Sequence, residues 1–233
     1  PNLASLFQSG DAAFVANVGT LIEPVTHFSH VSQKTKQLPL GLYSHSDQIE
    51  QWQTSVPHSR SGLGWAGRAM DLIRSINPDP TISMNISTSG SNVWQTGVSG
   101  AEYAVSAGNS QQPTGGAVPL EGYEFDYGMD RIVNAMSGAI DNQLAMQYQD
   151  LLSKTLQQKR KSALESYHLY SAATADPLPG NVSFPNTIVG RQLNQVARAI
   201  SGRQAIGALR QTFFVQRGGW DHHSETLPLQ AVM

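Results

Sequence analysis

The sequence predicts an α/β protein, and three observations support this fold class. Residues 12–18 form an apolar run, interrupted by Asn17, of the kind found in strands that are buried on both faces of a parallel sheet. Residues 209–215 end in the apolar run Thr212-Phe213-Phe214-Val215, which predicts a second buried strand. Between these two runs, apolar residues recur at helical spacing from Met129 to about Ala173. Strands and a long amphipathic helix are therefore expected in one chain.

The first third of the chain predicts short helices joined by loops. Residues 2–7 have a short helical pattern that stops at Gly10, and residues 23–45 form a loop that holds three of the seven histidines. A helix is expected from Asp47 to Thr54, capped by Ser44 or Ser46, because a serine oxygen can accept a hydrogen bond from the first turn. Residues 64–73 then predict an amphipathic helix.

The middle of the chain has a different character. Residues 81–87 alternate apolar and polar side chains, which predicts a half-buried strand. Residues 92–96 and 103–105 predict further short strands. Residues 106–128 are rich in Gly, Pro and Gln and predict a long surface loop or lid.

The last third predicts helices and then the final strand. The basic tract Lys159-Arg160-Lys161 lies on the long helix and is interpreted as a solvated face. Thr187 is expected to cap a further helix. The apolar stripe predicted for that helix consists of Leu193, Val196, Ala197 and Ile200.

Composition narrows the classes of function. The 233 residues suit one large domain or two small ones. A formal charge of −2 without a large basic block argues against nucleic-acid binding. The absence of cysteine means that any metal would be held by histidines and carboxylates. The sequence contains no run of 18 or more apolar residues, so it predicts no membrane-spanning helix.

The stretch from Gly218 to His223 is the strongest candidate for a functional motif. An acid and two imidazoles directly follow a predicted strand and two glycines, and ligands bind beyond the carboxyl ends of strands in open α/β sheets. Residues i and i+2 of an extended segment point the same way, so Asp221 and His223 could bind one ion while His222 faces elsewhere. A catalytic zinc generally has three protein ligands, so at least one more ligand must come from elsewhere in the protein. The alternative is a turn in which Asp221 caps a helix beginning near Ser224.

Seven stretches of the chain are considered together: Tyr43-Ser44-His45, Trp52-Gln53-Thr54, Gly64-Trp65-Ala66-Gly67-Arg68, Phe184-Pro185, Gly190-Arg191-Gln192-Leu193, Phe213-Phe214-Val215 and Gly218-Gly219-Trp220-Asp221-His222-His223. In order and rough spacing they resemble one family, the exported bacterial domain-of-unknown-function family 1501 of the alkaline phosphatase/sulfatase-like superfamily. The resemblance covers most of the chain.

This resemblance implies a three-layer α/β/α sandwich with a mostly parallel sheet and one domain over residues 1–233, with an insertion or lid-like region around 76–128. The implied activity is metal-dependent hydrolysis of phosphate or sulfate esters. Zinc is the first expectation for the metal, with manganese, calcium or magnesium as alternatives. The implied location is the periplasm or cell surface, through twin-arginine export. An oligomeric state is left open.

The sequence also departs from the family. The family has a Gly-Gly-Ala-Asp-Gly-like motif after its first strand, and Ser-Glu/Asp-Phe-Gly-Arg-Thr and Thr/Ser-Asp-His-Gly/Ala stretches near its end. These three motifs do not occur in the printed sequence. The chain is therefore expected to be a fragment with about half of the metal ligands of the family and little or no activity alone.

The resemblance also implies roles for three more residues. Ser44, at a helix N-terminus, is the candidate nucleophile, and His45 is a candidate ligand or proton carrier. The alternative is an ordinary N-cap serine beside a loop histidine. Arg68 could bind a phosphate or sulfate, or instead pair with a nearby carboxylate. A second hypothesis is a non-catalytic exported binding or surface protein with a carbohydrate-like ligand, which the Ser, Gln and Asn content suits.

Overall fold

The computed structural model describes residues 3–14, 19–77, 81–111, 115–118 and 130–219, and it confirms the α/β class. The α-helices are α1 (Leu3–Gln8), α2 (Phe28–Ser32), α3 (His45–Thr54), α4 (Trp65–Ile73), α5 (Asp130–Ala145), α6 (Leu151–Ala173), α7 (Ile188–Ser201) and α8 (Arg203–Ile206). Short 3-10 helices span Arg74–Ile76 and Pro179–Asn181. The strands are β1 (Asn85–Ser87), β2 (Tyr103–Ala104) and β3 (Thr212–Phe214).

The three strands form one parallel sheet in the order β2-β1-β3. Ile86 in β1 lies opposite Tyr103 in β2 and Phe213 in β3. Because the strands are parallel, their carboxyl ends meet at one edge of the sheet. The chain leaves β1, β2 and β3 at this edge.

The face of the sheet that carries Ile86 is covered by helices α6, α7 and α8. The main apolar cluster joins Ile86 to Tyr170 of α6, Ala199 of α7 and Ile206 of α8. Tyr170 and Ala199 are fully buried, and Ile86 and Ile206 are 1% exposed. This cluster fixes the helices against the sheet, since burial of apolar surface is the main favourable contribution to folding.

The opposite face of the sheet is buried with polar side chains. Side chains alternate along a strand, so Asn85 and Ser87 lie on the face away from Ile86. Asn85 Nδ2 donates to the carbonyl of Gln95 at 3.0 Å, and Thr212 Oγ1 donates to Asn85 Oδ1 at 2.5 Å. Gln95 Nε2 donates to the carbonyl of Ile86 at 3.2 Å. The sequence predicted a half-buried strand here, but all three residues of β1 are buried because these hydrogen bonds satisfy the polar groups.

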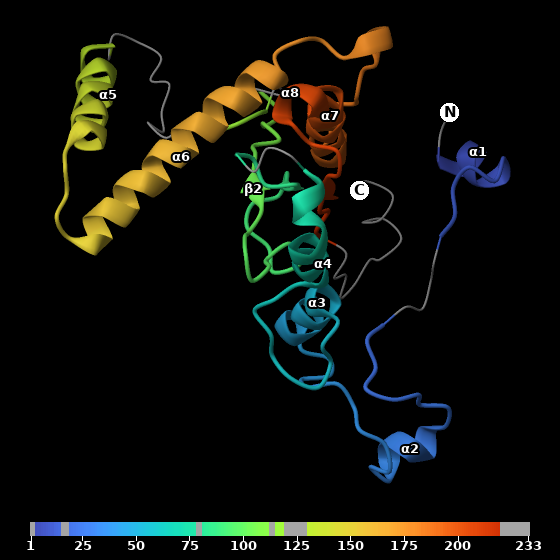
Figure 1. Ribbon diagram of the computed structural model, residues 1–233. Coiled ribbons are helices and arrows are strands. Elements are labelled where there is room, and N and C mark those ends of the chain that lie inside the picture. The colour runs from blue at the N-terminus through green and yellow to red at the C-terminus, as the bar shows by residue number, and fades with distance from the viewer. Residues whose placement is uncertain (1–2, 15–18, 78–80, 112–114, 119–129, 220–233) are drawn as a thin grey trace.

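The single helix predicted from Met129 to Ala173 is wrong, because the chain turns between α5 and α6. Asp150 caps α6, with its side chain accepting from the backbone N–H of Ser153 at 2.7 Å. Gln157 Nε2 donates to the carbonyls of Leu144 and Met146 at the end of α5, at 2.7 Å and 2.6 Å. The last carbonyls of a helix need such partners, so one side chain of α6 stabilises the reversal. Figure 1 shows the resulting hairpin projecting from the body of the molecule.

Two predicted strands are also corrected. Residues 92–96 form a turn, in which Asn92 Oδ1 accepts from the N–H of Gln95 at 2.9 Å and the N–H of Thr96 donates to the carbonyl of Val93 at 3.0 Å. Residues 12–14 belong to no strand, and the rest of the predicted strand 12–18 lies outside the described residues.

The apolar stripe predicted for α7 is wrong as well. Leu193 and Ile200 are 42% and 44% exposed, whereas Gln192 and Gln195 are 5% and 1% exposed. The predicted cap is confirmed, because Thr187 Oγ1 accepts from the N–H of Gly190 at 3.1 Å. The buried side of α7 therefore combines Gln192 and Gln195 with Gly190 and Ala199, and Gln192 has a specific partner that is described below.

Helices α1 and α2 lie away from the sheet, α4 adjoins it, and α3 lies next to α4 (Figure 1). α4 packs against β1, and α3 is joined to the 92–96 turn by a hydrogen bond from the N–H of Trp94 to Gln53 Oε1 at 3.0 Å. None of the helices in the described ranges is both long and apolar enough to cross a membrane.

Candidate functional site

A hollow of about 440 Å³ lies at the carboxyl edge of the sheet. Its lining includes Thr88 and Ser89 after β1, Ser106 after β2, and Arg191 and Gln192 from the first turns of α7. The crevice at this edge is where ligands bind in open α/β sheets. The hollow is therefore the candidate ligand-binding site.

The lining of the hollow combines neutral polar side chains with apolar ones, among them Val105, Val118 and Ile188. Ser106 Oγ accepts from the N–H of Gly108 at 3.0 Å, and Thr88 Oγ1 donates to the carbonyl of Phe214 at 3.0 Å. Arg191 is the one charged side chain among the described residues that line it. Such a lining suits a ligand with hydroxyl or other neutral polar groups and one anionic group.

Arg191 is held in place by the loop before α7. Its Nη1 donates to Asn186 Oδ1 at 2.8 Å, and Asn186 Nδ2 donates to the carbonyl of Ser110 at 3.0 Å. The guanidinium has five N–H donors in a planar fork, so this one strong bond orients the group without using all of its donors. The arginine is thereby positioned beside the hollow with capacity for an anion.

Helix α7 fixes the path of the chain directly after β3. Gln192 Nε2 donates to the carbonyl of Gln216 at 3.0 Å, and Gln192 Oε1 accepts from the N–H of the same residue at 2.9 Å. Gln216 is two residues beyond the last residue of β3. The chain then continues to Gly218 and Gly219, both exposed, which are the last described residues.

The two predicted metal ligands, Asp221 and His223, lie outside the described residues, as do Trp220 and His222. Within the described part of the chain, no group of three or more His, Asp or Glu side chains could hold a metal ion. The expectation of a zinc or other divalent ion at Asp221 and His223 therefore stays a prediction.

Ser44 is the N-cap of α3. Its Oγ accepts from the N–H of Asp47 at 3.5 Å and lies 3.3 Å from Ser46 Oγ. Asp47 also binds Arg60 at 3.1 Å. The hydrogen bond from the Ser44 side chain, followed by Arg60, lowers the pKa of the Asp47 carboxyl below its usual range. His45 is exposed and begins α3. The capping role is observed, and nucleophilic attack by Ser44 stays a prediction.

Arg68 lies at the other end of α3 from Ser44. Its Nη2 donates to the carbonyl of Thr54, the last residue of α3, and its Nη1 to the carbonyl of Leu63, both at 2.8 Å. A helix of ten residues is about 15 Å long, so Ser44 and the guanidinium of Arg68 lie far apart. Arg68 joins two segments of the backbone and, in the described part of the chain, forms no ion pair with a carboxylate.

Sequence reasoning overlooked Arg191 and Gln192 as site residues. A signal was available, because the predicted N-cap Thr187 places both in the first turns of a helix that precedes a predicted strand. The sequence does not show that the side of this helix with Arg191 and Gln192 faces the carboxyl edge of the sheet.

Comparison of the chain with protein-family models, with curated protein sequences and with solved structures found no match.

Proposed function

We propose that the chain carries part of a metal-dependent hydrolase for phosphate or sulfate esters, with the ester bound at the carboxyl edge of the sheet. The observation that carries the proposal is the convergence of two features at this edge. Arg191 borders the hollow there, and β3 leads from the same edge through Gly218 and Gly219 toward Asp221 and His223. The resemblance to the phosphatase/sulfatase-like superfamily supports this assignment and, with it, a three-layer arrangement around the parallel sheet.

In this proposal Arg191 binds the anionic ester group, and Asp221 and His223 supply two ligands to a divalent ion. Such an ion lowers the pKa of a bound water or alkoxide and stabilises the charge that develops on the transferred group. A third protein ligand is needed for a catalytic zinc. The nucleophile is either the metal-bound water or Ser44, and substitutions of Ser44 distinguish the two.

The proposal is tested by titration of Zn²⁺ and Mn²⁺ into the purified chain by calorimetry. The wild type is expected to bind one ion, and Asp221→Ala and His223→Ala are each expected to weaken binding at least about 10-fold, as loss of a ligand or of its support does. His222→Ala is the matched control, because the residue between two ligands of an extended segment faces away from the ion. Equal binding by all four proteins would overturn the metal site.

Activity is measured in parallel with an aryl phosphate and an aryl sulfate. Turnover that depends on the added metal and falls in Arg191→Gln, with metal binding unchanged, supports the placement of the ester group in the hollow. Metal binding without turnover on either substrate would contradict hydrolysis while leaving the ion site standing.

A second function, non-catalytic binding of a carbohydrate-like ligand, is favoured by one observation. The described lining of the hollow has neither a carboxylate nor a histidine, the groups that usually act as acids and bases. Its Ser, Thr and Gly residues and backbone groups suit hydroxyl groups of a sugar. A stable chain that binds oligosaccharides but neither zinc nor manganese would select this function.

A further inference from the structure

The hollow at the carboxyl edge of the sheet has an apolar wall as well as a charged group. The wall consists of Val105, which directly follows β2, together with Val118 and Ile188, the first residue of α7. Ile188 is 46% exposed and Val118 is 60% exposed, so both side chains are open to contact with a ligand. Val105 is 4% exposed and joins this wall to the apolar core.

Arg191 supplies the charge of the hollow, and its guanidinium has unused donors. Nη1 is bound to the carbonyl and the side chain of Asn186, and Nη2 has no partner among the described residues. Nε is buried without a hydrogen-bond partner in the same part of the chain. No carboxylate of the described residues forms an ion pair with Arg191. A guanidinium that is oriented but unpaired suits an anionic group of a ligand.

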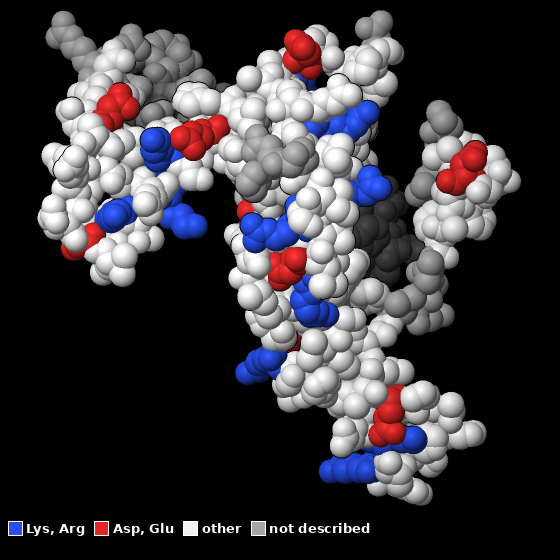
Figure 2. Space-filling model, in the orientation of Figure 1, with Lys and Arg blue, Asp and Glu red and all other residues white. Residues whose placement is uncertain are grey.

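The charge pattern favours a ligand with one anionic group. Arg191 is the one charged side chain among the described residues that line the hollow. Figure 2 shows Lys and Arg side chains spread over the face in view, with uncharged surface between them. A ligand with several anionic groups would leave most of them without a cationic partner in the hollow, and an unpaired charge is costly to remove from water.

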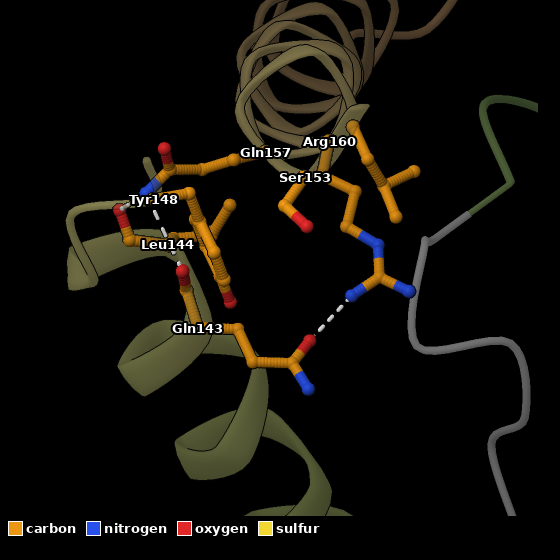
Figure 3. Close-up of a pocket in the computed structure, with 7 residues that line it drawn as sticks. Gln143, Leu144, Tyr148, Ser153, Gln157 and Arg160 are labelled. Atoms are coloured by element: carbon orange, nitrogen blue, oxygen red, sulfur yellow. Dashed lines mark hydrogen bonds between the residues drawn. The ribbon is translucent and has the colours of Figure 1, made fainter. Parts of the chain in front are cut away.

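Another hollow lies between α5 and α6, and its polar side chains have a structural role instead. It measures about 220 Å³, whereas ligand pockets usually measure about 300–1,000 Å³. Gln157 Nε2 donates to the carbonyls of Leu144 and Met146, and Arg160 Nη1 donates to Gln143 Oε1 (Figure 3). These bonds stabilise the reversal between the two helices. The hollow at the carboxyl edge, at about 440 Å³, is therefore the better ligand site.

We propose that the hollow at the carboxyl edge binds an amphiphilic ester, with its single sulfate or phosphate group on Arg191 and an aryl or alkyl group against Val105, Val118 and Ile188. This inference rests on the proposed function for the anionic group, and it adds the class of alcohol from which the ester is formed. A sugar ester would instead place hydroxyl groups against the valine and isoleucine methyl groups, where they would lose hydrogen bonds to water.

Alkyl sulfonates test the proposal, because each carries one negative charge and a carbon–sulfur bond that is not hydrolysed. Methanesulfonate, propane-1-sulfonate and hexane-1-sulfonate are titrated into methyl-labelled wild-type protein in EDTA, and NMR shifts of valine and isoleucine methyl groups report affinity and location. Affinity is expected to rise about fourfold for each CH₂ group that is buried against the wall, with shifts at Val118 and Ile188. An affinity independent of chain length, or shifts confined to other methyl groups, would overturn the proposal.

Two variants separate the charged group from the apolar wall. Arg191→Gln is expected to weaken binding of every sulfonate at least about 10-fold, through loss of hydrogen bonds to a charged group. Arg203→Gln is its control, because Arg203 is exposed on α8 and does not line the hollow. Val118→Thr keeps the branched shape and is expected to weaken only the longer sulfonates, by about threefold. Val98→Thr, at a residue that is 77% exposed outside the hollow, is the second control. Equal losses for short and long sulfonates in Val118→Thr would contradict contact with the wall.

The pair cyclohexylmethyl sulfate and glucose 6-sulfate distinguishes an apolar ester from a sugar ester. Tighter binding of cyclohexylmethyl sulfate in EDTA supports the proposal, whereas tighter binding of glucose 6-sulfate would overturn it. The metal site is measured separately, so the two proposals fail separately. A protein that binds zinc but prefers the sugar ester would contradict this inference alone. A protein that prefers the apolar ester but binds no metal would contradict only metal-dependent hydrolysis.

Discussion

Gln192 of α7 binds the backbone of Gln216 with both ends of its amide, at 3.0 Å through Nε2 and 2.9 Å through Oε1. The pairing imitates the two hydrogen bonds of a neighbouring strand, although it comes from a side chain. Gln192 is 5% exposed, so its amide would otherwise be buried without partners. The result is that the chain leaves β3 in a fixed direction, next to the hollow at the carboxyl edge.

Replacement of Gln192 is expected to destabilise the protein. Gln192→Ala leaves the N–H and carbonyl of Gln216 without this partner, at a cost of about 1–3 kcal/mol. Urea denaturation followed by circular dichroism measures the change in the free energy of unfolding. Gln158→Ala on the exposed surface of α6 is the control, because it makes the same substitution in a helix and should change stability by less than about 0.5 kcal/mol. Similar losses in both variants would contradict the role of the Gln192 amide.

Gly67 allows α4 to approach the 92–97 segment closely. A Cβ built at Gly67 would lie 2.1 Å from the carbonyl oxygen of Thr96, an atom of the backbone that cannot move aside easily. Gly67→Ala is therefore expected to cost about 1–3 kcal/mol through overpacking.

The same substitution at Gly138 of α5 is expected to have the opposite sign. A Cβ there meets no atom within 4 Å, and alanine is favoured over glycine in a helix by about 0.8–1.0 kcal/mol. Thermal unfolding of both variants gives the comparison. A stabilised Gly67→Ala variant would show that α4 lies farther from the turn than the structure places it.

Substitutions of Ser44 separate its capping role from a catalytic one. Loss of an N-cap costs about 1 kcal/mol, so Ser44→Ala is expected to lower stability, whereas Ser44→Asp keeps a capping oxygen and should preserve it. Metal-dependent turnover, where it is found, is expected to persist in Ser44→Asp if metal-bound water is the nucleophile. Loss of all turnover in a stable Ser44→Asp variant would identify Ser44 as the nucleophile instead.

Asp71 of α4 makes stability depend on pH in the acid range. Its carboxylate accepts from the N–H groups of Ser99 at 2.9 Å and Val98 at 2.7 Å, and the hydrogen bond from Ser99, followed by that from Val98, lowers the pKa of Asp71 below its usual 3.8. A lowered pKa in the folded state gives stability that is present above the unfolded pKa and is lost as the pH falls through the folded pKa.

Asp71→Asn is therefore expected to be less stable than the wild type at pH 7 and to approach it as the pH falls through the lowered pKa of the wild-type carboxyl, which then becomes protonated. Urea denaturation across this pH range gives the difference in the free energy of unfolding. A difference that stays constant from pH 7 to pH 2 would mean that the charge of Asp71 has no part in these hydrogen bonds.

The parts of the fold that sequence predicted well depend on local chemistry. The N-caps Ser44 and Thr187 and the helices that follow them were predicted from residues within one helical turn, because capping involves only neighbours in the chain. The break between α5 and α6 was missed, since apolar periodicity continues across it. The decisive contacts, from Gln157 to the carbonyls of α5, join residues that are eleven or more apart.

For the candidate site, too, some features follow from local sequence and others depend on tertiary contacts. The absence of cysteine ligands and the amphipathic character of several helices follow from the sequence, because they depend on residue types and short spacings, and the pairing of Asp221 with His223 on one ion stays a prediction of the same kind. Only the tertiary structure decided that Gln192 and Gln195 are buried while Leu193 and Ile200 stay exposed, and that Arg191 borders the carboxyl edge. Periodicity alone favours burial of the apolar stripe, whereas tertiary packing buries the side of α7 that carries Gln192, Gln195 and Ala199. The Gln192 amide pairs with the backbone beyond β3, and the Gln195 amide has no hydrogen-bond partner among the described residues.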